Sequence, residues 1–367
     1  MNQNQKPKLR STVNVIIPCY NYGRYLDGCV RSIFRATRLD VNVIIIDDCS
    51  NDETTQVIEG LSQEFDNVRV VRHDINQGHI STYNHGLSLV DAEFVHLISA
   101  DDQLTPYALD RAVSIMEKHP DVGMVYGRAI VGDTPPKFQS YSGGGTSYSV
   151  VSGSDWISAR FSDGLNPIYS PEVTLRAAVA GDAGPYDHSL PSTADLEMWL
   201  RIAARSNVAV INNASQAFYR IHPNNMHKAH SKEGLLAGLR ERRSAYELFI
   251  KKDGHLVRNA DNLMKAAQSK IARDALARAA RLFDDGEMKR LDLEEVCEFA
   301  KLTDVLCCDS MGWSAIHNRI SRTHRHGMSL PLIGGLKVRV NDWWQWKTRQ
   351  RDMGCRGINS LFYGQLP

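Results

Sequence analysis

The fold is decided by the stretch Val95-His96-Leu97-Ile98-Ser99-Ala100-Asp101-Asp102-Gln103-Leu104, an apolar run that ends in two adjacent carboxylates. A short buried strand followed at once by paired Asp is costly to place near a core unless a cation meets the charges. In open α/β sheets ligands bind beyond the carboxyl ends of the strands, where two Asp can hold Mg²⁺ or Mn²⁺ against a substrate diphosphate. The alternative is a solvated strand-to-loop junction with an Asp cap before a helix at Pro106. The surrounding chain favours the metal-binding interpretation.

Upstream of this stretch, three apolar runs have the β-branched character of buried strands. They are Val13–Pro18, Val41–Ile46 and Val68–Val71. Helical patterns lie between the strands. These are found near Tyr25–Arg38, from a capping signal at Ser50–Glu53 through Leu61, and around Asn84 and Gly86. Strand alternating with helix through about Tyr126 predicts a parallel, doubly wound sheet with a nucleotide site beyond its strand ends.

Two strands of this expected sheet end in acids, Asp47-Asp48 and Asp101-Asp102. Gly78 supplies a loop whose backbone can approach a ligand closely. No GxGxxG follows the first strand, and no GxxxxGK[ST] occurs in the chain. These absences argue against a dinucleotide-dependent oxidoreductase and against a P-loop NTPase.

The composition is that of an ordinary globular protein, with 367 residues, 43% hydrophobic and 23% charged. This length holds one large domain with an appendage, or two domains. The net charge of +1 hides an asymmetry, because residues 319 to 351 contain eight Lys and Arg against the single acid Asp342. This local excess of positive charge indicates that the C-terminal region has a function separate from that of the rest of the chain.

Seven Cys form an odd set without a CxxC pair, which fits a reducing compartment. Residues 1–11 are expected to be a flexible N-terminus without the apolar core of a signal peptide. No stretch approaches the roughly 18 apolar residues that would span a bilayer. We expect a cytoplasmic protein that does not bind nucleic acid.

Ordered motifs along the first two thirds of the chain identify a family resemblance. The motifs are Val15–Asn21, Ile45–Thr54, Asn76–Gly78, Asn84–Gly86, Ser99–Asp102, Pro120–Gly127, Ala194–Arg201 and Tyr219–Pro223. Over roughly residues 12 to 228 they resemble the family 2 glycosyltransferases with the GT-A fold. The resemblance implies an α/β fold with a Rossmann-like, mostly parallel central sheet flanked by helices. A C-terminal helical extension follows it.

This resemblance also implies the nucleotide and metal ligands. Asp48 is expected to read the base, and Asp101 and Asp102 to form the DXD-type element that holds the ribose and a metal diphosphate. Ser99 stands where many relatives carry the first Asp of a DxDD pattern, so Asp102 is the expected main metal ligand, with Asp101 nearer the ribose. His222 is expected near the diphosphate or the Mn²⁺ or Mg²⁺ ion, a structural histidine being the alternative. The other expected nucleotide-binding residues are Pro18, Tyr20, Asn21, Gly78, Asn84, Ser99 and Ala100.

The second half of the expected site lies in Leu190–Arg201, where the pattern predicts a helix with Asp195 in its first turn. An inverting transfer needs one carboxylate that takes the proton of the acceptor hydroxyl. The resemblance gives this role to Asp195, with Glu197 in reserve. Ala194 replaces the Glu that commonly precedes this Asp in the family. The alternative for Asp195 is a helix N-terminal charge that stabilises by about 0.3 to 1 kcal/mol.

Three further segments have open interpretations. Pro135–Ser154, rich in Gly, Ser and Pro, is either a mobile loop near the acceptor or a plain surface loop, and Asn166–Pro171 is an expected acceptor wall. Amphipathic patterns predict helices over Leu235–Ile250, Ala260–Leu282 and Leu291–Leu306. Asp342–Lys347, with three Trp inside the basic region, is either an interfacial membrane contact or a cluster that packs on the protein.

We therefore expect a metal-dependent inverting glycosyltransferase that uses a nucleotide-diphosphate sugar, with UDP ahead of dTDP and GDP. The acceptor hydroxyl would belong to a glycan, a lipid-linked sugar or a small molecule in bacterial polysaccharide or glycoconjugate synthesis. The expected domains are a nucleotide half at 12–126, an acceptor half at 127–228 and a helical region with a basic tail at 229–367. A homodimer and a peripheral contact with the inner face of the cell membrane are left open.

Two rival functions are weighed against this expectation. A sugar nucleotidyltransferase shares the architecture but ordinarily has a Gly-rich basic loop after the first strand, which is absent here. A sugar-nucleotide-binding scaffold without catalysis is compatible with Ala194 and Ser99. The presence of all four site carboxylates opposes the scaffold. These carboxylates are Asp48, Asp101, Asp102 and Asp195.

Overall fold

The computed structural model describes residues 11–35, 37–138, 145–223, 225 and 232–326. The chain forms two compact units: the first comprises residues 1–153 and 168–222, and the second comprises residues 154–167 and 223–367. The second unit thus includes a segment that lies within the acceptor half expected from the sequence. The basic stretch around Asp342–Lys347 and the N-terminal residues 1–10 lie outside the described residues.

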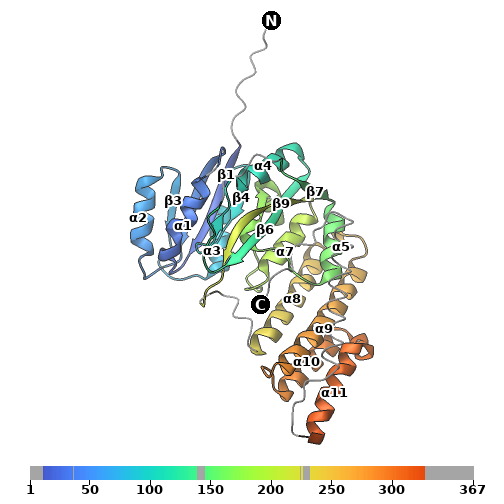
Figure 1. The fold of residues 1–367 in the computed structure, drawn as a ribbon. Coiled ribbons are helices and arrows are strands. Elements are labelled where there is room, and N and C mark those ends of the chain that lie inside the picture. Colours follow the sequence, from blue (N-terminus) through green and yellow to red (C-terminus); the bar gives the residue numbers. More distant parts are fainter. Residues whose placement is uncertain (1–10, 36, 139–144, 224, 226–231, 327–367) are drawn as a thin grey trace. The chain divides into compact units, whose positions relative to one another are not determined.

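A nine-stranded sheet with the order β3-β2-β1-β4-β8-β6-β9-β5 forms the centre of the first unit, and β7 pairs with β9 (Figure 1). Its strands are β1 (Thr12–Cys19), β2 (Asp40–Asp47), β3 (Val68–Arg72), β4 (Phe94–Leu97), β5 (Gln103–Leu104), β6 (Val122–Gly132), β7 (Tyr148–Val151), β8 (Thr174–Arg176) and β9 (Asn207–Arg220). β3, β2, β1 and β4 are parallel neighbours. β6 and β9 are also parallel, whereas β8, β5 and β7 run antiparallel to their neighbours. The predicted mostly parallel sheet is confirmed.

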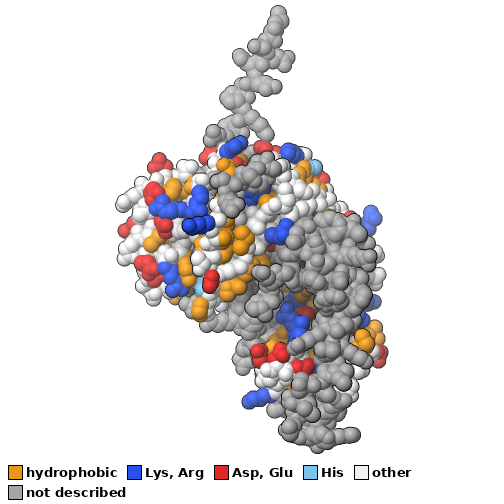
Figure 2. Space-filling model, viewed as in Figure 1, with side chains coloured by type: hydrophobic (Ala, Val, Ile, Leu, Met, Phe, Trp, Pro, Cys, Tyr) orange, Lys and Arg blue, Asp and Glu red, His pale blue; other side chains and the backbone are white. Residues whose placement is uncertain are grey.

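The helices of the first unit pack through buried apolar residues. They are α1 (Gly23–Phe34), α2 (Thr54–Glu64), α3 (His79–Ser88), α4 (Ala108–Lys118), α6 (Ala177–Ala183) and α7 (Ala194–Ala203), with a short 3₁₀ helix, η1 (Ser170–Glu172). In α1, Leu26, Val30 and Ile33 are buried, as their spacing predicts. The helix expected through Arg38 ends at Phe34. Charged side chains of both signs are interspersed on the face of this unit seen in Figure 2.

The stretch that decides the fold is divided differently from the single strand expected for it. β4 ends at Leu97, and a turn follows in which the Asp102 amide donates to the Ser99 carbonyl at 3.1 Å. The chain then pairs with β9 through the short strand β5. No side chain caps α4, whose N-cap residue is Tyr107, so the interpretation of the acids as helix caps is wrong. The turn leaves both carboxylates buried beside β9.

The second unit is helical, and the helices expected near residues 235, 260 and 291 are present. It contains α5 (Gly153–Asp163), α8 (Lys232–Asp253), η2 (Gly254–Leu256), α9 (Ala260–Asp284), α10 (Arg290–Thr303), η3 (Val305–Asp309) and α11 (Met311–His326). Tyr246 of α8 donates a hydrogen bond to the Arg160 carbonyl at 2.9 Å and packs against Phe161 of α5. These contacts tie residues 154–167 to the C-terminal helices. Within the described ranges, no helix has both the length and the apolar character needed to cross a bilayer.

Candidate functional site

Asp101 and Asp102, the two acids that follow β4, lie next to the end of β9. Gln103 pairs with Phe218 in the antiparallel β5–β9 register, so the preceding residues lie beside Arg220. The Arg220 amide donates to Oδ1 of Asp102 at 2.9 Å, and its guanidinium Nε donates to the Asp101 carbonyl at 2.9 Å. Nε2 of His222 lies 3.0 Å from Oδ2 of Asp101. Three predicted metal ligands, Asp101, Asp102 and His222, are therefore in one place.

Burial dominates the electrostatics of this acid pair. Asp101 and Asp102 are 5% and 2% exposed. Burial, and then the negative charge of Asp101, raise the pKa of Asp102 well above its ordinary value, and Arg220 offsets this only in part. A buried carboxylate pair of this kind is stabilised by a bound cation.

The side chains of Asp101, Asp102 and His222 fit a divalent metal that a bound ligand would also coordinate. Two carboxylates and one imidazole suit Mn²⁺, which accepts both oxygen and nitrogen donors. Among the residues that the structure describes, no three or more His, Cys, Asp and Glu are arranged to hold a metal by themselves. The protein would thus supply a few ligands, and diphosphate oxygens and water would complete the coordination.

Aromatic rings enclose the acid pair from the side of α1. The ring centroids of Tyr22 and Tyr25 lie 5.6 and 5.3 Å from that of His222. The Arg220 guanidinium lies 4.7 Å from the centroid of Tyr25. Burial, and then the charges of Asp101 and Asp102, raise the pKa of Tyr22 to about 12. These rings keep water from the acids and strengthen charge interactions there.

The loop after β1 is held to the loop after β2. Asn21 has a left-handed backbone (φ 57°), which Asn adopts more readily than most residues. Its amide donates to Oγ of Ser50 at 2.9 Å, and its side-chain oxygen accepts from the Asn51 amide at 2.8 Å. Tyr20 is 46% exposed beside it. Of the nucleotide residues predicted here, Asn21 has a clear structural use and Tyr20 presents an open aromatic surface. Pro18 lies in β1 opposite Ile46.

Asp48 organises the loop that contains Gly78. Its Oδ1 accepts from the Gln77 amide at 2.8 Å, and its Oδ2 accepts from the Gly78 amide at 2.9 Å. Burial by itself raises the pKa of Asp48, but the hydrogen bonds from Gln77, His73 and Gly78 outweigh burial, and the net pKa is lowered. Gly78 has φ 81°, which explains why Gly occupies this position. Asp48 is therefore an ionised acceptor at the end of β2.

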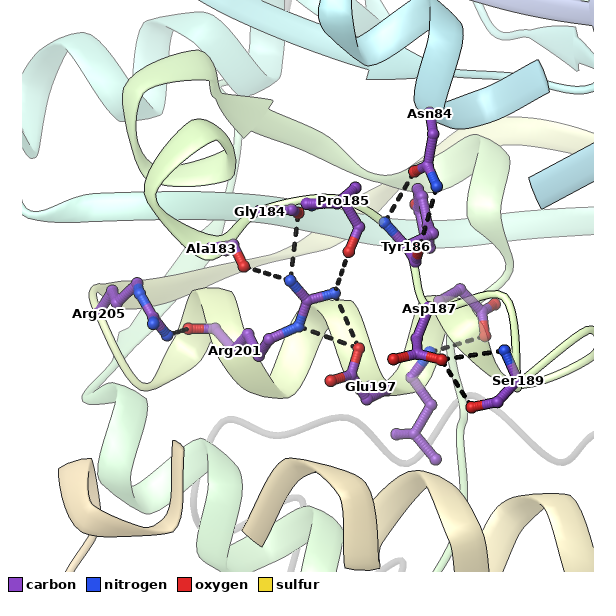
Figure 3. A network of polar contacts seen from close by, with 12 residues as sticks. Asn84, Ala183, Gly184, Pro185, Tyr186, Asp187, Ser189, Glu197, Arg201 and Arg205 are labelled. Atoms are coloured by element: carbon purple, nitrogen blue, oxygen red, sulfur yellow. Dashed lines mark hydrogen bonds and ion pairs between the residues drawn. The ribbon is translucent and has the colours of Figure 1, made fainter. Parts of the chain in front are cut away.

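Asn84 holds the loop that leads to α7. Its amide nitrogen donates to the Tyr186 carbonyl at 2.9 Å, and its oxygen accepts from the Tyr186 amide at 2.8 Å (Figure 3). His79 reaches the same loop, with Nε2 lying 2.6 Å from the Pro191 carbonyl oxygen. Ala100 is fully buried and Ser99 partly buried in the turn after β4. Asn84 thus links α3 to the segment that carries the expected base.

Asp195 lies in the first turn of α7, as predicted, and is partly buried. Its Oδ2 accepts a hydrogen bond from Oγ of Ser170 at 3.3 Å. The neighbouring Tyr169 ring stacks on Tyr219 with centroids 4.5 Å apart. The expected acceptor wall at Ser170 and the expected base are therefore neighbours.

Two tyrosines connect the two halves of the site. Burial, then Tyr186, and then the charges of Asp101, Asp102 and Asp195 raise the pKa of Tyr83 well above its ordinary value. The pKa of Tyr219 is raised by burial and then by Asp102, Asp101, Tyr169 and Asp195. A negative charge disfavours a nearby phenolate, and this effect falls off with distance. Contacts agree with this: the Arg220 amide donates to Asp102, and the adjacent Tyr219 packs on Tyr169, whose neighbour Ser170 donates to Asp195.

The protein-family comparison matches residues 14–164 to the Glycosyl transferase family 2 model. Over these residues the chain is similar to the family 2 glycosyltransferases. An uncharacterized glycosyltransferase of Nostoc sp. is 32% identical over 115 residues, which are 31% of this chain and 35% of that protein. The GalNAc(5)-diNAcBac-PP-undecaprenol beta-1,3-glucosyltransferase of Campylobacter jejuni is 29% identical over 159 residues, 42% of this chain and 49% of that protein. The chain thus spans about a third to a half of the length of these two curated relatives.

Solved structures extend the likeness in fold. Residues 1–349 of TarS from Staphylococcus aureus match with a TM-score of 0.54 at 17% identity, covering 86% of this chain and 92% of TarS 1–349. The mannosyltransferase PcManGT of Pyrobaculum calidifontis, solved with GDP-Man and Mn²⁺, matches with a TM-score of 0.54 at 13% identity, covering 93% of this chain and 91% of PcManGT. The GT-A fold expected from the sequence is confirmed. The family match contains Asp48, Asp101 and Asp102, while Asp195 and His222 lie beyond it.

Glu197, the reserve candidate for the base, is engaged in a buried ion pair. Its side chain is 0% exposed, and Arg201 donates to its Oε2 from Nε at 2.9 Å (Figure 3). Arg201 also donates to the carbonyls of Ala183, Gly184 and Pro185. Through Arg201, Glu197 thereby holds the loop before α7 in place. This geometry favours Asp195 over Glu197 as the residue that meets an acceptor.

Several residues of the candidate site have no role predicted from the sequence. Arg220 stands inside the quoted Tyr219–Pro223 motif, and its place two residues before His222 was the available signal. Tyr83 and Tyr186 carry no comparable signal, because their ring contact at 5.6 Å joins residues far apart in the chain. Such contacts depend on how α3 packs against the loop before α7.

Proposed function

We propose that the first unit is a metal-dependent, inverting glycosyltransferase that uses a nucleotide-diphosphate sugar, with UDP the foremost candidate. The proposal rests on two contacts at the end of β9 in a chain whose residues 14–164 match the family 2 model. The Arg220 amide donates to Asp102, and the neighbouring Tyr219 packs on Tyr169, next to which Ser170 donates to Asp195. An acid pair suited to a metal diphosphate and a separate acid suited to a base are the two parts that this transfer needs.

In this proposal each acid has one role. Asp48 accepts a hydrogen bond from the nucleotide base at the end of β2. Asp102, Asp101 and His222 would hold a divalent ion, which would supply positive charge for the diphosphate leaving group. Asp195 takes the proton of the acceptor hydroxyl as the oxygen attacks the anomeric carbon from the face opposite the diphosphate.

Solved neighbours support a nucleotide-sugar donor but differ in its base. TarS has been solved with UDP and with UDP-GlcNAc, and PcManGT with GDP-Man and Mn²⁺. A glycan or lipid-linked acceptor is suggested by the Campylobacter glucosyltransferase, whose name gives an undecaprenol-linked glycan. Tyr169, which is 36% exposed and stacks on Tyr219, offers a sugar-sized aromatic surface beside Asp195. We place the acceptor against it.

A thermal-shift panel tests the donor proposal. UDP, dTDP and GDP are each added with and without Mn²⁺, and one of them should raise the melting temperature only when the metal is present. At about 100 times Kd, a ligand stabilises the folded protein by about 2.7 kcal/mol. Absence of a metal-dependent shift with all three nucleotides would contradict the proposal. Synthesis of a nucleotide sugar from a sugar 1-phosphate and UTP would favour the nucleotidyltransferase instead.

For the basic C-terminal segment we propose peripheral association with the inner face of the membrane, in a cytoplasmic enzyme whose described thiols are all unpaired. The five Lys and Arg of residues 337 to 351 would attract anionic lipid, and the three Trp of Asp342–Lys347 would enter the interface. Removing residues 334 to 367 should abolish flotation with anionic vesicles at low salt and spare donor hydrolysis. If the intact protein does not float with these vesicles, a packing or homodimer role replaces the membrane role.

A further inference from the structure

Three polar side chains, Asp48, His73 and His85, form a series of hydrogen bonds that starts in the loop after β2. Nδ1 of His73 lies 2.7 Å from Oδ1 of Asp48, and Nε2 of His73 lies 2.8 Å from Nδ1 of His85. Asp48 and His73 are 3% and 8% exposed, and the two imidazole rings are stacked with their planes 3° apart. None of the roles assigned above uses either histidine.

The ionised state of Asp48 fixes the direction of the hydrogen bonds in this chain. Because the pKa of Asp48 is lowered, its carboxylate accepts, and Nδ1 of His73 must carry the proton that it donates. In a neutral ring Nε2 of His73 is then an acceptor, and it receives the Nδ1 proton of His85. Asp48 therefore fixes the tautomer of His73, His85 donates to that tautomer and holds the ring, and His73 orients the carboxylate. Metal-bound histidines are oriented by their own second partners in the same way.

The acceptor capacity of Asp48 is almost used up by these contacts. A carboxylate has about four lone-pair directions. His73 and Gln77 occupy the two directions on Oδ1, and Gly78 occupies one on Oδ2. Thr82 lies close enough to lower the pKa of Asp48, but the single hydroxyl proton of Thr82 is donated to the Gly78 carbonyl at 2.9 Å. One direction on Oδ2 is therefore left for a ligand N–H.

We propose that His73, oriented by His85, is a positioning residue for nucleotide specificity, which holds Asp48 so that Oδ2 accepts the ring N–H of the base. This inference rests on the proposed function, in which Asp48 reads the base. Uracil, thymine and guanine carry a ring N–H on the edge that pairs with other bases, whereas adenine and cytosine carry an acceptor nitrogen there. A carboxylate with one free acceptor direction therefore selects uracil, thymine and guanine and rejects adenine and cytosine.

The test compares UDP with N3-methyl-UDP, which lacks the ring N–H, by calorimetric Kd on the full chain with Mn²⁺. Wild type should prefer UDP by about tenfold or more, the effect of one hydrogen bond to a charged group. In His73→Gln the side-chain amide lies near the Nε2 position of the lost imidazole, so Asp48 loses the donor that Nδ1 supplied. The preference for UDP over N3-methyl-UDP should then fall below about threefold. His73→Asn places its amide nitrogen near the Nδ1 position, so the preference should stay within about threefold of wild type. GDP and N1-methyl-GDP take the place of this pair if the chain binds GDP.

The ratio of the two Kd values separates positioning from general damage. A structural role would weaken both nucleotides equally and leave the preference unchanged, and this result in His73→Gln would overturn the inference. His119→Gln, at a histidine paired with Tyr148 in another part of the unit, is the matched control and should behave as wild type. If His73→Gln does not fold, His85→Phe keeps the stacked ring, removes its Nδ1 proton and should also lower the preference.

Failure of the proposed function gives a different result. If wild type binds UDP and N3-methyl-UDP equally, Asp48 does not read the base and the inference falls, although a glycosyltransferase remains. If wild type binds none of UDP, dTDP and GDP with Mn²⁺, the proposed function itself falls, and the inference with it.

Discussion

Asp195→Asn should reduce sugar transfer by about 10² to 10⁴-fold while donor and metal still bind. Asn has the size of Asp and can accept a hydrogen bond from Ser170, but it cannot take the proton of the acceptor hydroxyl. The loss should therefore fall on kcat, with the donor Kd unchanged. Steady-state kinetics and nucleotide titration on the same preparation measure the two quantities.

Two control variants separate a base from other roles of the α7 acids. If Asp195 were only a helix N-terminal charge, its removal would cost under about 1 kcal/mol, or roughly fivefold. Glu197→Gln breaks a buried ion pair with Arg201, so it should lower the melting temperature and leave kcat of the folded enzyme near wild type. Loss of transfer in Glu197→Gln, together with less than about a fivefold loss in Asp195→Asn, would move the base assignment to Glu197.

Asp102→Asn should abolish the Mn²⁺-dependent part of nucleotide binding, a loss of at least about tenfold in Kd. The variant keeps an oxygen that accepts from the Arg220 amide, so the β5–β9 junction should hold. It removes the negative charge that a cation needs in this buried place. Asp133→Asn is the matched control. The backbone carbonyl of Asp133 accepts a hydrogen bond from Arg220, but its side chain is exposed. Wild-type binding that excess EDTA leaves unchanged would contradict the assignment.

The nucleotide half of the fold follows from sequence pattern because its signals are local. β1, β2 and β4 are mainly apolar, Asp48 comes directly after β2, and Asp101 follows β4 after a short turn. Parallel strands place their carboxyl ends at one edge, so these acids gather without any knowledge of side-chain packing. Asp195 was located in the same way, by its place in the first turn of an apolar-faced helix.

Other parts of the fold and of the site depend on tertiary contacts that no local pattern encodes. β8 has three residues and lies antiparallel between β4 and β6, and β5 has two residues that pair only because β9 passes beside them. The amide of Asn84 has the chemistry of a ligand-binding group, yet it is held by Tyr186, 102 residues later in the chain. The chain from Asp48 through His73 to His85 likewise exists only after β2, β3 and α3 are packed.

The central claim is an inverting transfer with a single base, and the anomeric configuration of the sugar released from the donor tests it most directly. The full chain, Mn²⁺ and α-configured UDP-sugars are followed by proton NMR before mutarotation mixes the anomers, with water as the acceptor. An attack from the face opposite the diphosphate predicts that the β-anomer forms first, and that it disappears in Asp195→Asn. Initial release of the α-anomer would contradict the account.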